Sequence, residues 1–275
     1  MKKWLAGAVA AASIFGLAAC GNDSGAGSDE KELVVGASNV PHAEILEQVK
    51  PILEEKGIDL QIETYQDYIL PNKDLDNGDI DANYFQTIPY MELQMKDNEG
   101  YDFVNAGGIH IEPIGVYSKK YKSLEDLPEG ATILMSNSVS DHGRILSLLE
   151  KKGLITLKDG VENTQAQIED IEENPRNLKF DYEYEAGMLP QMYENEEGDA
   201  VVINSNYAID AGLKPLEDSI AIEDTDSPYV NVITVNKGDE DKEEVKELVK
   251  ALRSKKIQDF INKEWDGAVV PVSEE

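Results

Sequence analysis

Basic residues are scarce in this chain of 275 residues: 25 lysines and arginines stand against 55 acidic residues, and the formal net charge is −30. A polyanion of this strength is repelled by nucleic acid, and the sequence has no basic patch with interleaved aromatic residues. The composition therefore excludes a nucleic-acid-binding protein and favours a soluble, well-hydrated surface. At this length the chain can form one large domain or two lobes with an ample core.

Cysteine is nearly absent, since Cys20 is the only one, and an intramolecular disulfide is therefore excluded. It follows a short basic start and an apolar run from Trp4 to Leu17, which is too short to span a bilayer comfortably. We therefore expect an export signal over residues 1–19. Because Cys20 stands in LAAC, which resembles the bacterial lipobox, we expect it to be lipidated. The polar, Gly/Ser-rich segment 20–31 then predicts a flexible tether.

Signatures of catalysis and of metal binding are missing too. The chain has no G-x-S-x-G, no P-loop and no G-x-G-x-x-G. The three histidines do not pair at a metal-ligand spacing: His42, His110 and His142. The acidic stretch that begins at Asn72 lacks the glycine and glutamate that a calcium loop needs, which favours a solvated loop. The sequence predicts neither an enzyme nor a metal site nor a cofactor.

Apolar and amphipathic stretches alternate along the rest of the chain, which predicts an α/β fold with mostly parallel, doubly wound sheets. Strand patterns lie at 33–37, 58–65, 79–85, 101–106, 113–120, 131–136, 199–204 and 228–238. Helix patterns lie at 41–56, 89–98, 140–152 and 241–263. Two α/β units with a late return strand predict two lobes with a ligand cleft between them. We expect one lobe over 32–113 and 231–275, ending in a long helix, and the other over 114–230.

Aromatic residues make up only 7% of the chain, yet five of them fall within 26 residues: Tyr65, Tyr68, Tyr84, Phe85 and Tyr90. If Tyr84 and Phe85 end a strand, one ring faces the core and the other lines whatever lies beyond the strand. The pattern alone fits core packing as well as a binding site.

Arginine is rarer still, with three residues against 22 lysines, and Arg144 stands in the expected opening turn of the helix at 140–152. The N-terminus of a helix disfavours a cation. A salt bridge to one of the many carboxylates explains this position. A ligand carboxylate at the helix N-terminus explains it too, because the planar guanidinium fork matches a carboxylate.

Six blocks of the sequence together resemble the NlpA/MetQ family of lipoproteins, the methionine-binding subunits of ABC importers. They are VGASNVPHAEIL, DYILPNKDLDNGDIDANYFQTIPY, PIGVYSKK, SDHGRILSLLEKKGLITLKDG, VVINSNYAIDAGL and SPYVNVITVNKGDE. The resemblance runs over essentially the whole mature body and implies the two-lobed periplasmic-binding-protein (type II) fold. It implies a monomeric receptor outside the cell membrane, held there by a lipid anchor, which hands methionine to a permease driven by a cytoplasmic ATPase.

The resemblance also implies the ligand-binding residues. Aromatic side chains would contact the methionine side chain, Arg144 would pair with the ligand carboxylate, and two asparagines would bond the amino-acid backbone. In this sequence these positions are Tyr68, Phe85, Tyr90, Arg144, Asn204 and Asn231, and Thr87 is expected in the same ligand-binding set. Thr87 stands where the family most often has histidine, so the ligand stays open among L-methionine, D-methionine, an oxidised form and a methionine-containing dipeptide. A surface adhesin or envelope scaffold with the same fold, binding no small molecule, is the alternative from another class.

Overall fold

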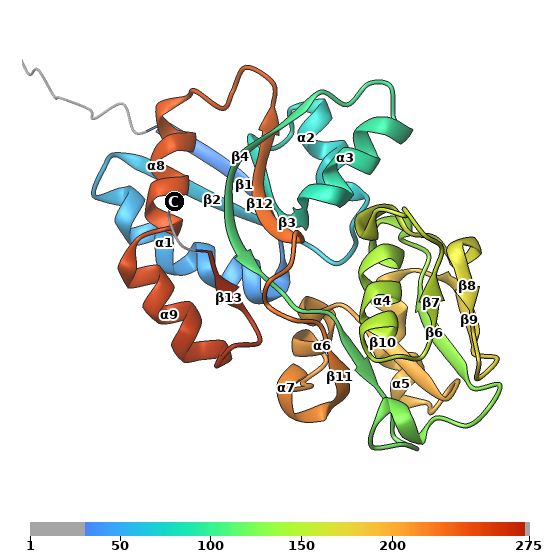
Figure 1. Ribbon diagram of the computed structural model, residues 1–275. Coiled ribbons are helices and arrows are strands. Elements are labelled where there is room, and N and C mark those ends of the chain that lie inside the picture. The colour runs from blue at the N-terminus through green and yellow to red at the C-terminus, as the bar shows by residue number, and fades with distance from the viewer. Residues whose placement is uncertain (1–30, 273–275) are drawn as a thin grey trace, which may run out of the picture.

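The computed structural model describes residues 31–272, which form two α/β units joined by two chain crossings (Figure 1). The signal peptide expected over residues 1–19 lies outside the described residues, and so do Cys20 and the tether except for Lys31, which opens the first strand. No helix within residues 31–272 combines the length and the apolar character needed to cross a membrane.

The first unit is built on a six-stranded sheet with the order β13-β4-β12-β3-β1-β2. Its strands are β1 (Lys31–Ser38), β2 (Ile58–Tyr65), β3 (Ala82–Thr87), β4 (Phe103–Ile111), β12 (Val230–Asn236) and β13 (Val270–Pro271). Its helices are α1 (Glu44–Glu54), α2 (Leu70–Asn77), α3 (Ile88–Asp97), α8 (Glu243–Leu252) and α9 (Lys255–Trp265). β1 is parallel to β2 and β3, whereas β12 is antiparallel to both β3 and β4.

Apolar residues at helical spacing fix α1 against this sheet. Ile45, Leu46, Val49 and Leu53 are each fully buried, and they pack with α8 and α9 in one core cluster. Burying a side chain of this size stabilises the fold by about 1.5–3 kcal/mol. Gly57 follows with φ of 75°, a left-handed conformation that suits glycine and turns the chain into β2.

The second unit is built on a five-stranded sheet with the order β11-β5-β10-β6-β9. Its strands are β5 (Gly115–Tyr117), β6 (Thr132–Ser136), β9 (Lys179–Tyr184), β10 (Ala200–Ile203) and β11 (Ser219–Ile222). Its helices are α4 (Val139–Lys151), α5 (Leu189–Glu194), α6 (Ser205–Asp210) and α7 (Pro215–Asp218). A small antiparallel pair, β7 (Thr156–Leu157) and β8 (Ile171–Glu173), lies beside them. Ile133, Ile145, Leu149 and Val202 belong to a separate apolar core.

The chain passes from the first unit to the second after β4 and returns into β12. In the sheet, Ile111 at the end of β4 pairs with Val230 at the start of β12. The outgoing and the returning crossing therefore lie side by side at the same end of these two neighbouring strands. Two adjacent crossings between two separate cores form a natural hinge. The expected two-lobed α/β fold is confirmed.

Three finer expectations were wrong. Both sheets are mixed rather than mostly parallel. In the first, the returning strand β12 starts beside the end of β4 and must run against it, and in the second, β5 runs against both β10 and β11. The helix expected over 241–263 is two helices, since Ser254 has an extended backbone (φ −61°, ψ 148°) at the N-cap of α9. Residues 72–77 belong to α2 rather than to a loop; Pro71 stands in the first turn and Gly78, at φ 75°, ends it.

Candidate functional site

A small cavity of ≈ 30 Å³ lies between the two units, beside the crossings. Around it the structure brings together all seven residues that the sequence predicts as ligand-binding: Tyr68, Phe85, Thr87, Tyr90, Arg144, Asn204 and Asn231. Five further polar residues also line it: Gln86, Glu112, Asp141, Ser205 and Asn206. Most of these positions follow or end strands of the two sheets, which is where α/β proteins usually bind ligands.

One wall of the cavity is aromatic and belongs to the first unit. Along β3 the side chains alternate, so Tyr84 is fully buried in the core while its neighbour Phe85 lines the cavity. The ring centroid of Tyr68 lies 5.8 Å from that of Phe85 and 5.9 Å from that of Tyr90. Tilted and edge-on contacts at these distances make a surface that suits a polarisable apolar group.

Tyr68 also joins the two units. Its hydroxyl donates a hydrogen bond of 2.6 Å to Asn206 Oδ1, and its ring centroid lies 5.0 Å from that of Tyr207; both partners are in α6. Desolvation raises the pKa of Tyr68 well above its ordinary value, so the hydroxyl stays protonated and donates. Parting the two units breaks this bond.

Arg144 is the sixth residue of α4, so it lies in the second turn rather than in the opening turn that the sequence predicts. Its guanidinium forms an ion pair with Glu223, to which Nε donates at 3.0 Å, and Nη2 donates to the Glu112 carbonyl at 2.8 Å. Its Cζ atom lies 4.5 Å from the centroid of the Tyr229 ring. Desolvation opposes the charge of Arg144, but Glu223 and Asp141 outweigh it and raise the pKa.

One edge of this guanidinium stays available. Nη1 makes no hydrogen bond to a described residue, and Asp141 Oδ1 lies 3.9 Å from it. The salt bridge that the sequence allowed as one explanation of Arg144 is thus present, with Glu223, and Nη1 is left to meet a group in the cavity.

The two predicted asparagines lie next to strand ends: Asn204 directly follows β10, and Asn231 is the second residue of β12. Asn204 occupies the N-cap position of α6 without a side-chain capping bond. Its Nδ2 donates to Asp141 Oδ2 at 2.9 Å, which leaves its side-chain oxygen Oδ1 for another partner. Asn231 is buried near the start of β12, where it pairs in register with Thr87, and its Oδ1 lies 3.1 Å from His42 Nε2. Thr87 is half-buried at the end of β3.

Two carboxylates in the cavity were not predicted. Glu112 and Asp141 are only 6% and 5% exposed, and desolvation raises the pKa of both. In a chain with 55 acidic residues, no feature of the sequence distinguishes these two from the rest. Their significance comes from burial, which only the fold provides.

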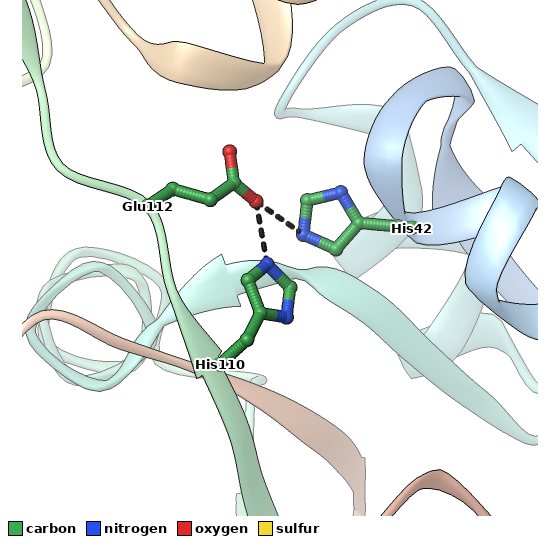
Figure 2. Close-up of side chains that lie close together, drawn as sticks. All are labelled: His42, His110 and Glu112. Atoms are coloured by element: carbon green, nitrogen blue, oxygen red, sulfur yellow. Dashed lines mark hydrogen bonds and ion pairs between the residues drawn. The ribbon is translucent and has the colours of Figure 1, made fainter. Parts of the chain in front are cut away.

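Figure 2 shows Glu112 between two histidines at the start of the first crossing. Its Oε1 lies 2.7 Å from His110 Nε2 and 3.1 Å from His42 Nε2, and the Tyr84 hydroxyl is hydrogen-bonded to His110 Nδ1. Burial lowers the pKa of His42 to about 4 and that of His110 to about 3, so both rings are neutral near pH 7.

The same three side chains are of types that bind transition metals, and their donor atoms lie within 4.8 Å of one another. The sequence prediction of no metal site overlooked this group, because His42 and His110 are distant in the chain. In the structure these atoms bond to each other through Glu112 Oε1, so the group acts as a hydrogen-bonded support for Glu112 and, through His42, for Asn231. Such second-layer contacts fix the orientation of polar groups in a site.

A larger chamber of ≈ 700 Å³ lies beside the small cavity and shares Tyr68 and Tyr90 with it. Its lining comes from both units and includes Ile69 and Met188, which are 59% and 52% exposed. Tyr68 and Tyr90 therefore form the partition between the small cavity and this outer chamber.

Fold and site together define a two-lobed solute-binding protein, with a polar, aromatic-walled cavity at the hinge between its lobes. The NlpA lipoprotein family model matches residues 33–273, and the chain belongs to that family. The chain is 51% identical over 275 residues, all of both chains, to the methionine-binding lipoprotein MetQ of Bacillus subtilis (strain 168). It is 42% identical over 255 residues, 92% of each chain, to the D-methionine-binding lipoprotein MetQ of Salmonella typhi.

A solved structure of a nutrient-binding protein from Burkholderia cenocepacia, bound to methionine, is also similar to this chain. The TM-score is 0.81 and the sequence identity 43%, over 87% of this chain and 99% of that one.

Proposed function

We propose that this protein is the substrate-binding lipoprotein of an ABC importer and that it binds methionine. The observation that carries the proposal is the meeting of an aromatic wall, an arginine and two asparagines around one cavity between the lobes. Membership of the NlpA family and similarity to proteins named for methionine or D-methionine binding support it.

The thioether packs against the rings of Tyr68, Phe85 and Tyr90, since sulfur makes favourable contacts with aromatic rings. The ligand carboxylate meets Nη1 of Arg144, and Asn204 and Asn231 bond the amino-acid backbone. A buried zwitterion needs polar partners at both of its charged ends. Binding alone is required of this site, and no bond is made or broken.

Lobe closure completes the site. We assign residues 32–113 and 231–275 to one lobe and 114–230 to the other, a division supported by strand membership in the two sheets. A cavity of ≈ 30 Å³ holds one or two water molecules, so an amino acid enters by a parting of the lobes at the crossings. Closure then rebuilds the bond from Tyr68 to Asn206, and the closed form presents the ligand to the permease.

Lipidation of Cys20 anchors the receptor to the cell membrane, facing out of the cytoplasm. This assignment is supported by the LAAC motif and by the family of lipoproteins to which the chain belongs. The partners are the permease with its cytoplasmic ATPase, and the receptor acts as a monomer without a cofactor.

The test is calorimetric titration of the mature protein, residues 21–275, with L-methionine, D-methionine, methionine sulfoxide and glycyl-methionine. Leucine is the control, because it carries the same charged groups without sulfur. We expect saturable one-to-one binding of methionine, and a rise in unfolding temperature as ligand in hundredfold excess over its Kd adds about 2.7 kcal/mol. If none of the four compounds binds or shifts the unfolding temperature, the scaffold alternative replaces the receptor.

A further inference from the structure

The cavity between the lobes carries more negative than positive charge. Its lining contains two carboxylates, Glu112 and Asp141, and one cation, Arg144. That cation is already paired with a third carboxylate, Glu223. The histidines that contact Glu112 do not balance its charge, because burial keeps both neutral near pH 7.

Isolated buried carboxylates are costly unless a cation or hydrogen-bond donors compensate them. Glu112 Oε1 is hydrogen-bonded to His110 Nε2, and Asp141 Oδ2 accepts a hydrogen bond from Asn204 Nδ2. Each carboxylate therefore has a fixed direction. Among the described residues that line the cavity there is no lysine that could pair with either carboxylate. The arrangement suits a ligand that brings its own positive charge.

We propose that Glu112 and Asp141 bind the α-ammonium group of the ligand and so select amino acids with a free amine. This inference rests on the proposed function and deepens it. Arg144 Nη1 then takes the ligand carboxylate, and the two protein carboxylates take the ammonium. The side-chain oxygen of Asn204, Oδ1, which makes no hydrogen bond to a described residue, completes the set of acceptors.

The assignment decides between methionine and a dipeptide that ends in methionine. In glycyl-methionine an uncharged amide N–H replaces the α-ammonium, and the charged amine moves away by one residue, about 3.8 Å. An amide donates a single, uncharged hydrogen bond where the site offers two carboxylates. The charge of this cavity therefore favours the free amino acid.

The test compares L-methionine with its hydroxy analogue, in which a hydroxyl replaces the ammonium group, by calorimetric titration of the mature protein. Hydrogen bonds to charged groups contribute about 1.5–3 kcal/mol, so we expect the wild type to prefer methionine about 10- to 100-fold. Glu112→Gln and Asp141→Asn keep side-chain size and remove the charge. Each variant should lower the affinity for methionine about 10-fold or more, and it should change the affinity for the analogue by less than about 3-fold.

Glu185→Gln is the matched control, because Glu185 is an exposed carboxylate of the outer chamber and its loss changes the net charge equally. It should leave both affinities unchanged. Equal affinity of the wild type for methionine and the analogue overturns the inference, and so does an equal loss for both compounds in both variants. In either case methionine still binds and the proposed function stands; only a wild type that binds no methionine refutes that function itself.

Discussion

Arg144 offers the sharpest test of the site, because its two roles can be separated. It forms an ion pair with Glu223, whose side chain is 12% exposed, and we propose that its Nη1 meets the ligand carboxylate. Arg144→Met removes both interactions and keeps much of the apolar stem. Losing one partner of a buried ion pair costs about 3–5 kcal/mol, because the other charge stays buried and unpaired.

For a chain of this size each kcal/mol lowers the unfolding temperature by about 2–4 °C, so the single variant should unfold about 6–20 °C below the wild type. We expect its affinity for methionine to fall about 100-fold or more, as for truncation of a buried charge pair at a binding interface. A lower affinity alone would be ambiguous, because a destabilised protein can bind poorly for structural reasons.

The double variant Arg144→Met with Glu223→Gln resolves this ambiguity. It removes both charges, and replacing a whole buried pair by uncharged groups is often neutral for stability. In urea unfolding, the double variant should regain most of the stability that Arg144→Met loses. Its affinity for methionine, measured by calorimetry, should stay as low as that of the single variant. A double variant that binds methionine as tightly as the wild type would refute the role of Arg144 in ligand binding.

Arg253→Met is the control for loss of an arginine as such. Arg253 donates from Nε to the Gly108 carbonyl at 2.9 Å within the first unit, and it does not line the cavity. Replacing Arg253 should lower the stability of the protein without lowering its affinity for methionine. An equal loss of affinity in this variant would trace the effect of Arg144 to general destabilisation.

Three other side chains or backbone positions can be tested in the same way. Tyr68→Phe removes the bond to Asn206 between the lobes, so methionine affinity in calorimetry should fall about 5-fold, for one hydrogen bond near 1 kcal/mol; an unchanged affinity would contradict the closure role of Tyr68. Gly143→Ala puts a Cβ atom 2.2 Å from the Asn163 carbonyl oxygen, so urea unfolding should show a loss of about 1–3 kcal/mol although alanine favours helices. Burial lowers the pKa of His42 to about 4, whereas the ring titrates near 6.5 in the unfolded chain. As the pH falls from 6.5 towards 4, His42 is therefore protonated in the unfolded chain but not in the native state. The native state loses stability in that pH range. Between pH 7 and pH 5 the wild type should therefore lose about 1–2 kcal/mol more than His42→Asn, and equal losses would show that this ring is not held neutral.

The opposite directions of Tyr84 and Phe85 could be predicted because they depend on a local rule, whereas Tyr68 and Tyr90 were assigned through the family resemblance. The alternation of a strand sends Tyr84 to the core and Phe85 to the cavity, and the strand itself is visible in the apolar pattern. The break between α8 and α9 was missed for the opposite reason. The apolar spacing continues on both sides of Ser254, and an extended backbone at one serine leaves almost no trace in periodicity.

Arg144 shows where local rules stop. Its rarity drew attention to it, and it does line the cavity, but its partner Glu223 directly follows β11 and is brought there by the pairing of β11 with β5 in the second sheet. The topology of the mixed sheets escaped prediction similarly, since the direction of β12 depends on which edge of the first unit receives the returning chain.

Residues of scarce types are therefore easier to assign from sequence than residues of common types. One arginine among three, or one aromatic cluster in a chain with few aromatics, stands out in the amino-acid sequence alone. Glu112 and Asp141 belong to the commonest chemical class in this chain, and what distinguishes them is that the fold removes them from water beside an arginine that is already paired. Charge in a protein of this composition is informative only after burial has been assigned, because a solvated carboxylate interacts weakly and a buried one requires a partner. The positive end of the ligand is thus the part of the proposed recognition that sequence reasoning could not supply.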